Sequence, residues 1–486
     1  MGPTEKSLGD IFMGVDVWGR GSHGGGGFGL YKALSHIDPE SLGLSVALFG
    51  QAWTWESEQD KPGWTWEQWW DYERKLWIGP TSKLIGVPEA PKDERDPDCI
   101  HGPFLPISSF FPRSPPPNPA DLAFHTMFCP GVGRAWFVEG VKVLQSVDGW
   151  TDIDKQCSVG DMVWPHPSLA WEDGDWSDQL PEASTAFCFD DAWNGGSSLR
   201  LDVSTSIPRY QEDAIFRCLW LPVQSLSITS GKSYEASVVF KLGSAFQVDV
   251  DFGLSVKVLQ GAHDQVIKVT DTSSHTNFSG GWTRLSVHFS LSSDPVNTGL
   301  DTLVAVGFII GYALDSHMQP FSFSFLVGQL NVFPIPPPQA TRYRPIIFWA
   351  DFHRPSADPT PGRITGILSW DAVVSLAPLK TVNLTSPDDP IPIWTLDMSD
   401  RWFPSYLYFN IYMQAHPTSG PESAIWIGTT GLDGLHNRFA VDVPLSEAAK
   451  NTTSIRLFIQ GVTDHGEVLP WQQCVFVDIN IQELGP

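Results

Sequence analysis

The sequence predicts an α/β part followed by an all-β part: the last strands of an incomplete (β/α)8 barrel of the TIM type, and then two antiparallel β-sandwich domains. Two short apolar runs, Met13–Val17 and Val46–Phe49, are separated by a helix-length spacer, as parallel strands of an α/β barrel are. After about residue 145 the pattern changes to short alternating runs between Gly and Ser turns, which is typical of antiparallel sandwiches. The predicted domains are therefore residues 1–145, 146–335 and 339–486.

The first apolar run carries a candidate binding face. Asp16, Trp18 and Arg20 alternate with two valines, so in a strand these three side chains share one side, which in a barrel would be the lumen. An aromatic ring beside a carboxylate and a guanidinium suits a neutral, polyhydroxylated ligand, because sugars offer flat C–H faces for stacking and hydroxyls for charged partners. The alternative is an ordinary buried strand in which Asp16 and Arg20 only satisfy one another.

Tryptophans follow the second apolar run. Trp53, Trp55 and Glu56 come directly after it, at the end of a strand where barrel active sites assemble, which favours sugar contact for the two tryptophans. A further group of tryptophans has roughly helical spacing and consists of Trp66, Trp69, Trp70 and Trp77. That stripe predicts a helix face packed on the barrel rather than a ligand platform.

The rest of the chain contains two proline-rich segments, which are expected to be connections, and alternating runs, which are expected to be strands. Ser114–Pro119 is expected to be a surface loop, and Phe333–Pro338 a stiff connector that cannot join a sheet ladder. The strand-like runs before the connector are Ser198–Val203, Ala236–Leu242, Phe246–Val256, Arg284–Leu291 and Thr302–Ile310. Those after it are Leu368–Asp371, Tyr406–Gln414, Ile425–Gly428, Ser454–Gly461 and Cys474–Ile481. A Trp on an early strand and a later Phe-x-Ile-x-Met run make the last domain similar to a fibronectin type III sandwich.

The motifs of the first 300 residues resemble glycoside hydrolase family 85, the cytosolic endo-β-N-acetylglucosaminidases. The family's Gly-[Val/Ile]-Asp-Val-[Phe/Trp]-Gly-Arg-Gly strand corresponds to Gly14–Gly21, and its Gly-Gly-Gly-Phe turn to Gly25–Phe28. Further ordered matches are Val46–Glu56, Phe124–Gly133, Asp191–Leu199 and Ser279–Trp282. The resemblance implies substrate-binding roles for Asp16, Trp18, Arg20, Trp53, Trp55, Glu56 and Phe128.

One of these matches has two interpretations. Asp191–Leu199 resembles a corner of the family's jelly-roll domain, which implies that the second domain is a jelly roll. Asp190 or Asp191 could contact carbohydrate or calcium there. The favoured alternative is a tight Gly-Gly turn with Trp193 in the core.

The resemblance also implies an activity. Enzymes of this family cleave the bond between the two core N-acetylglucosamines of an N-glycan, and the substrate's own acetamido oxygen attacks the anomeric carbon to give an oxazoline with retention. The implied partners are N-glycans or glycoproteins, the implied location is the cytosol, and no cofactor is expected. The reaction still needs one general acid and a partner that orients the acetamide.

The sequence departs from the family at the catalytic motif. Family members place Asn-x-Glu upstream of the Gly-x-Asp-Val strand, where Glu is the acid/base and Asn orients the acetamido group, and no Asn-x-Glu occurs in this sequence. Neither Asp16 nor Glu56 is a replacement, because both occupy binding-face positions and a carboxylate near an arginine is kept ionised. We therefore expect no catalytic residue in this chain, with the earlier barrel strands missing and the chain inactive alone. The alternative is a non-catalytic carbohydrate-binding protein.

The composition of the chain argues against several classes of partner and site. A formal net charge of −25, from 30 basic and 55 acidic residues, disfavours nucleic acid and anionic membranes. No apolar stretch approaches the roughly 18 residues of a membrane span. The six cysteines have no Cys-x-x-Cys spacing, so neither a disulfide framework nor a metal site is expected. The pattern does not indicate an oligomeric state.

Overall fold

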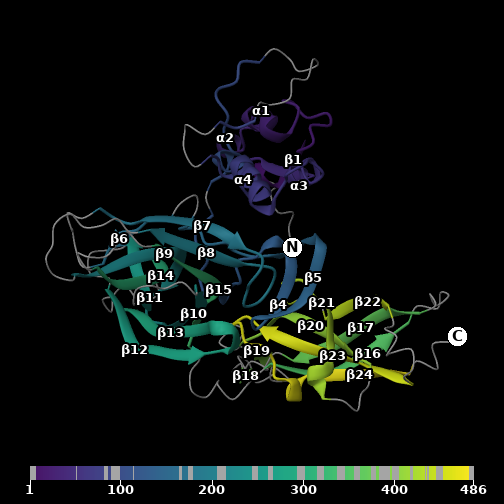
Figure 1. The fold of residues 1–486 in the computed structure, drawn as a ribbon. Helices are drawn as coiled ribbons and strands as arrows, with labels where there is room; N and C mark the ends of the chain where they lie inside the picture. The colour runs from purple at the N-terminus through teal and green to yellow at the C-terminus, as the bar shows by residue number, and fades with distance from the viewer. Residues whose placement is uncertain are drawn as a thin grey trace, which may run out of the picture. The chain divides into compact units, whose positions relative to one another are not determined.

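The chain forms two compact units, Met1–Pro115 and Pro116–Pro486 (Figure 1). The computed structural model describes residues 7–80, 86–88, 99–163, 167–172, 179–204, 215–243, 250–260, 266–292, 301–314, 322–335, 345–354, 362–373, 379–381, 394–396, 404–415, 420–444 and 453–480, apart from residues 51, 113, 433, 435 and 436. The division between the units falls within the proline-rich segment Ser114–Pro119. The predicted domain limit at residue 145 lies instead within β5 (Val141–Gln156).

The two apolar runs of the first unit form parallel strands, as predicted. β1 (Phe12–Asp16) pairs with β2 (Ser45–Phe49) in a register that runs from Phe12 opposite Ser45 to Asp16 opposite Phe49. The helical elements of this unit are η1 (Leu8–Asp10), η2 (Gly27–Gly29), α1 (Leu30–Ile37), α2 (Pro39–Leu42), α3 (Trp53–Glu56), α4 (Trp66–Trp77) and η3 (Ile107–Phe110). Helix α1 lies between the two strands in the chain, and its buried Leu30, Ala33 and Leu34 lie on one helical face, which packs into the core.

Helix α4 confirms the predicted helix at the tryptophan stripe. Thr65 caps its N-terminus, since the Thr65 hydroxyl accepts a hydrogen bond from the Gln68 backbone N–H at 3.2 Å. Trp69 is 5% exposed and Leu76 1% exposed, so this face of the helix is packed in the core. The side chain of Trp66 lies outside the described residues.

The first half of the second unit consists of two antiparallel sheets over one shared core. One sheet has the order β12-β13-β10-β15-β8-β7 with β3 also paired to β15, and the other has the order β11-β14-β9-β6. The strands of the larger sheet are β3 (Phe124–Thr126), β7 (Glu182–Cys188), β8 (Ser198–Ser204), β10 (Ser233–Leu242), β12 (Val266–Asn277), β13 (Trp282–Ser292) and β15 (Ser322–Pro334). Those of the smaller sheet are β6 (Ala170–Trp171), β9 (Ile215–Thr229), β11 (Val250–Gln260) and β14 (Asp301–Leu314).

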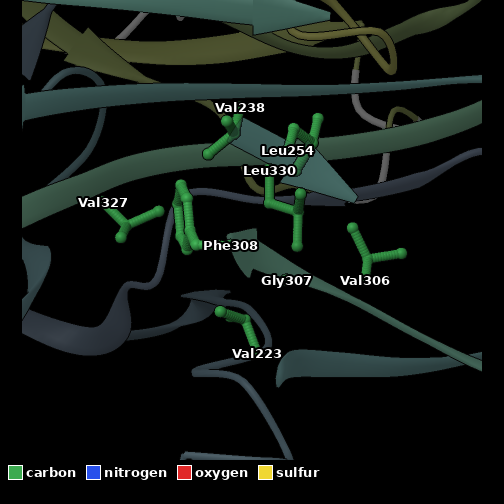
Figure 2. Close-up of a pocket in the computed structure, with 8 residues that line it drawn as sticks. All are labelled: Val223, Val238, Leu254, Val306, Gly307, Phe308, Val327 and Leu330. Carbon is green, nitrogen blue, oxygen red and sulfur yellow. The ribbon is translucent and has the colours of Figure 1, made fainter. Parts of the chain in front are cut away.

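The core between these sheets is built from aliphatic and aromatic side chains of the described strands. Phe308 of β14 and Phe325 of β15 meet with ring centroids 5.3 Å apart and nearly perpendicular planes. Figure 2 shows aliphatic side chains from both sheets grouped around Phe308, among them Val223, Leu254 and Leu330. A Cβ at Gly307 would lie 2.2 Å from the Leu221 carbonyl oxygen, which explains the glycine there. The small cavity that these side chains line is part of the packing core rather than a polar ligand site.

The second half of the second unit repeats this plan with smaller sheets. Their orders are β16-β17-β22 and β21-β20-β23-β24, and β18 pairs with β19. The core joins the two larger sheets through residues such as Trp370 and Phe409, whose rings lie 4.9 Å apart. The strands are β16 (Ile346–His353), β17 (Arg363–Val373), β18 (Leu379–Thr381), β19 (Trp394–Leu396), β20 (Tyr406–Gln414), β21 (Ile425–Thr429), β22 (Arg438–Pro444), β23 (Ser454–Thr463) and β24 (Val475–Asn480).

A hairpin links the two halves of this unit. β4 (Pro130–Val138) pairs with β5, and Trp136 of β4 stacks on Trp426 of β21 with ring centroids 6.2 Å apart. Met127 and Cys129 share a buried cluster with residues of β20 and β23. The hairpin therefore packs against the C-terminal sheet, although its sequence lies next to the first unit.

The alternating runs predicted as strands are confirmed wherever the structure describes them. Residues 246–249 of one run and residue 481 of another lie outside the described residues, and Cys474 precedes β24. The predicted connector begins later than expected, because β15 continues to Pro334, which pairs with Tyr234 at the end of the ladder. Residues 336–338 of that connector lie outside the described residues. Among the described residues, no helix has the length and apolar character needed to cross a membrane.

The Gly-Gly turn after Asp191 has the packing role favoured from the sequence. Trp193 is 2% exposed, and Gly195 adopts a φ of +82° that suits glycine. Asp191 forms an ion pair with Lys241, with Nζ 2.6 Å from Oδ2. The carboxylate is thus paired within the protein and holds the turn against β10.

Candidate functional site

The predicted binding face lies at the carboxyl ends of the two parallel strands of the first unit. Asp16 and Phe49 are the last residues of β1 and β2 and lie opposite one another. Val15 and Val17 are buried, whereas Trp18 is 38% exposed. The predicted alternation of buried and exposed side chains therefore continues through Val17 and Trp18, although β1 itself ends at Asp16. Carboxyl ends of parallel strands are where α/β proteins collect their ligand-binding side chains.

Asp16 and Arg20 form a well-defined pair. The Arg20 Nε donates to Asp16 Oδ2 at 2.7 Å, and the Trp18 backbone N–H donates to Asp16 Oδ1 at 3.0 Å. The hydrogen bond from the Arg20 guanidinium holds the pKa of Asp16 below its usual value, despite partial desolvation. The Asp16 backbone N–H in turn donates to the Ser22 hydroxyl at 2.8 Å. Asp16 is thus an oriented, ionised acceptor and is poorly suited to act as a general acid.

Arg20 presents its charge to solvent. Its side chain is 65% exposed, and the guanidinium lies over the Phe49 ring with the central carbon 5.4 Å from the centroid. The hydrogen bond to Asp16 raises the pKa of Arg20, and the negative charges of Asp16 and then of Glu56 add to this effect. Glu56 is itself exposed, so two carboxylates and one guanidinium lie on this part of the surface. These groups can accept from and donate to sugar hydroxyls.

Trp18 offers the exposed aromatic surface of the face. Gly50, directly after β2, has a φ of +76°, and a Cβ built there would lie only 2.7 Å from Trp18 Cδ1. The indole therefore packs over the backbone of Gly50, while Trp18 as a whole stays partly exposed. The glycine is required twice, for the left-handed backbone and for the close approach of the ring.

Trp53 is packed more than the sequence suggested. Its ring stacks on Tyr72 of α4 with centroids 5.7 Å apart and meets the edge of Phe28 at 6.1 Å. A Cβ at Gly27 would lie 2.5 Å from Trp53 Cζ2, so the glycine-rich turn also covers this ring. Burial, reinforced by the charge of Glu58, raises the pKa of Tyr72 to about 12. Trp53 remains half-buried, and its main contacts join α3 to α4.

Trp55 and the neighbouring Thr54 also contact α4. The Trp55 ring lies 6.0 Å from that of Trp69, nearly perpendicular to it. The hydroxyl of the buried Thr54 donates to Glu73 Oε2, and burial raises the pKa of Glu73. Glu73 has no distinguishing motif in the sequence, because only the packing of α3 on α4 buries its carboxyl group. These contacts hold α3 in place beside the exposed face.

Phe128 lies in the second unit and is fully buried. Its ring belongs to the core between the two sheets of the first half of the second unit, and its backbone has a φ of +55°. The Phe128 N–H donates to the Thr126 hydroxyl at 2.9 Å, and its carbonyl accepts from the Ser197 hydroxyl at 3.0 Å. These bonds compensate for a left-handed conformation that costs about 1 kcal/mol in a non-glycine residue. The structure thus does not expose this ring to a ligand.

The first part of the chain matches a known protein family. Residues 3–136 match the model of glycosyl hydrolase family 85. The resemblance to this family is confirmed over that segment, which contains all seven residues of the predicted binding site. The matches at Asp191–Leu199 and Ser279–Trp282 lie beyond it and stay predictions.

The curated relatives that match this chain are named cytosolic endo-beta-N-acetylglucosaminidases. Cytosolic endo-beta-N-acetylglucosaminidase 1 of Arabidopsis thaliana is 38% identical over 69 residues, which is 14% of this chain and 10% of that protein. Cytosolic endo-beta-N-acetylglucosaminidase of Gallus gallus is 29% identical over 216 residues, or 44% of this chain and 22% of that protein. This chain therefore spans less than a quarter of the length of these relatives. The crystal structure of the Endo-D glycoside hydrolase domain from Streptococcus pneumoniae R6 aligns with 98% of this chain and 58% of that chain, at 14% identity and a TM-score of 0.49.

Proposed function

We propose that this chain belongs to a mannosyl-glycoprotein endo-β-N-acetylglucosaminidase, which hydrolyses the GlcNAc-β-1,4-GlcNAc core bond of N-glycans by substrate-assisted retaining catalysis. The match of residues 3–136 to glycosyl hydrolase family 85 carries this proposal. Its partners are N-glycans or glycoproteins, and its location is the cytosol, which the names of the curated relatives support. In this proposal β1 and β2 are among the last strands of a TIM-type barrel. Residues 1–145, 146–335 and 339–486 are then barrel, jelly-roll and fibronectin III-like domains.

The exposed face gives the chain its part in sugar binding. The Trp18 ring stacks on the C–H face of a core sugar, because Trp18 stays partly exposed while its ring packs on Gly50. Asp16 accepts from a sugar hydroxyl, and the exposed Arg20 donates to another. Glu56 adds an acceptor. Trp53 and Trp55 hold α3 in position and offer only their exposed edges, while the buried Phe128 has no place in this proposed site.

The chain alone is proposed to be catalytically inactive. Its sequence contains no Asn-x-Glu, and a positioned general acid commonly contributes a hundredfold or more in rate. Asp16 is no substitute, because Arg20 lowers its pKa and keeps it ionised. The absent motif equally supports a second candidate, a non-catalytic carbohydrate-binding protein. An in-frame Asn-x-Glu segment in the transcript upstream of Met1 would favour the enzyme over this candidate.

Incubation of the purified chain with a high-mannose glycopeptide tests the proposal. We expect binding by calorimetry without release of free glycan, and about fivefold weaker binding after Trp18→Ala, since stacking on an aromatic ring contributes about 1 kcal/mol. Trp349→Ala is the matched control, because Trp349 is similarly exposed at 42% but lies on β16 of the second unit. Glycan release would overturn the proposed inactivity. Equal binding by wild type and Trp18→Ala would overturn the proposed sugar face.

A further inference from the structure

Three histidines and a cysteine converge in the first unit, apart from the residues assigned to sugar binding. They are His23, His36, Cys99 and His101, and their ligand atoms all lie within 4.8 Å of one another. His23 lies in the turn before Gly24, His36 in the last turn of α1, and the other two residues in the segment before η3. Segments far apart in the sequence thus direct four metal-binding side chains to one point.

The three imidazoles contact one another directly. The ring of His23 lies with its centroid 4.8 Å from that of His36 and 5.1 Å from that of His101. The remaining pair, His36 and His101, is 5.0 Å apart. The Nε2 atoms of His23 and His101 are separated by 2.9 Å, so these two rings face each other through their nitrogens. Tyr31 of α1 meets the His101 ring at 6.3 Å and nearly at right angles.

The backbone fixes part of this arrangement. Gly24, next to His23, has a φ of +88°, and a Cβ there would lie 2.3 Å from the Gly29 carbonyl oxygen. Only glycine fits this close turn, which returns the chain toward the start of α1. The position of His23 beside the helix that carries His36 therefore follows from the glycine-rich turn.

We propose that these four side chains form a structural Zn²⁺ site. A tetrahedral zinc ion with bonds of about 2.0–2.1 Å to nitrogen and about 2.3 Å to sulfur places its ligand atoms roughly 3.3–3.6 Å apart. The ligand atoms of the cluster have separations on both sides of that spacing. The Nε2 atoms of His23 and His101 lie 2.9 Å apart, and no two ligand atoms are more than 4.8 Å apart. Side-chain rotations that move the ligand atoms by about 1 Å therefore complete the tetrahedral geometry.

The donor set selects the class of metal and its role. Imidazole nitrogen and thiolate sulfur suit zinc, whereas calcium and magnesium require oxygen ligands. Four protein ligands fill a tetrahedral shell and leave no position for water or substrate, which distinguishes a structural site from a catalytic one. The ion would join the end of α1 to the segment Cys99–His101 and stabilise a unit whose apolar core is small. This inference departs from the sequence-based expectation of no metal site.

Zinc binding to the full chain tests the inference. The purified protein is stripped with a chelator, dialysed, and titrated with Zn²⁺ alone, and bound metal is measured by mass spectrometry after equilibrium dialysis. We expect about one equivalent, bound about a hundredfold more weakly after His36→Gln or Cys99→Ser. The matched controls are His353→Gln, an exposed histidine of β16, and Cys188→Ser, both of which should bind as the wild type does. Stoichiometry well below one equivalent, or equal affinity in all variants, would overturn the site.

Cobalt substitution provides a second measurement that does not depend on affinity. Co²⁺ in the stripped protein should give the strong visible bands of tetrahedral coordination and a thiolate-to-cobalt charge-transfer band in the near ultraviolet. Cys99→Ser should abolish the charge-transfer band, whereas Cys188→Ser should keep it. Since His36 and Cys99 have exposed side chains, neither variant removes a core contact, and near-ultraviolet circular dichroism checks their folding. A weak spectrum typical of six-coordinate cobalt in the wild type would refute the inference.

Discussion

Two enclosed histidines in the second unit should make that unit sensitive to acid. His125 of β3 places Nδ1 2.5 Å from Asn331 Oδ1, and His465 stacks on Phe333 with ring centroids 3.6 Å apart. Burial lowers the pKa of each from 6.5 to about 4, and the charge of His125 adds to the effect on His465. The folded unit therefore holds both rings neutral at pH 7.

The sign and size of the effect follow from these pKa values. Between pH 6.5 and 4 the two histidines bind protons in the unfolded chain but not in the folded chain. Their contribution to the free energy of unfolding is therefore complete above pH 6.5 and is lost as the pH drops toward 4. Each histidine accounts for about 3 kcal/mol at 1.36 kcal/mol per pH unit. Asp464 opposes them, because burial raises its pKa from 3.8 to about 6, and its protonation stabilises the folded form by about 3 kcal/mol over a similar range. We expect a net loss of about 3 kcal/mol.

Urea unfolding at several pH values between 7.5 and 4.5, followed by circular dichroism of the β-sheets, measures this loss. His465→Phe keeps the stacking on Phe333 but cannot titrate, so the net pH dependence should nearly vanish in this variant. His353→Gln removes an exposed histidine and should behave as the wild type does. A free energy of unfolding that is constant over this range in the wild type, or equal pH dependence in the wild type and His465→Phe, would show that the burial argument is wrong.

Four further substitutions, one of them a control, test the packing of the two units and the proposed sugar binding. Trp69→Ala, which removes a ring that is 5% exposed, should destabilise the first unit by about 3–5 kcal/mol in thermal unfolding while N-glycan affinity per folded molecule stays within a factor of about two. A Cβ at Gly50 would lie 2.7 Å from Trp18 Cδ1, so Gly50→Ala should displace the Trp18 ring, add about 1–2 kcal/mol of backbone strain, and weaken glycopeptide binding about tenfold by calorimetry. Gly328→Ala would bring a Cβ within 2.5 Å of a buried tryptophan, so chemical denaturation should show a loss of about 2–3 kcal/mol, whereas Gly253→Ala, with its nearest contact at 3.8 Å, should cost less than about 1 kcal/mol. Unchanged midpoints for Trp69→Ala and Gly328→Ala would contradict the packing described for them.

Local periodicity was enough to predict the strands and the helix of the tryptophan stripe. The alternation of Val15 and Val17 with polar neighbours predicted which side of β1 is buried, because successive side chains of a strand point to opposite faces. The spacing of Trp69 and its neighbours predicted helix α4 for the same geometric reason, with a period of 3.6 residues. The motifs also predicted a resemblance to glycoside hydrolase family 85, which the family match confirms over residues 3–136.

Tertiary contacts decided what no local pattern encodes. Phe128 stands in a motif of the candidate site, yet the pairing of β3 with β15 places its ring in the core of the second unit. Trp53 follows a strand end as predicted, but only the position of Tyr72 on α4 shows that its ring is mainly a packing surface. The cluster around His23 and Cys99 has no spacing motif at all, since its members come from segments joined only in the folded chain. Sequence periodicity fixes the direction of a side chain relative to its own element, whereas burial, pKa and metal-ligand geometry depend on which other element lies opposite.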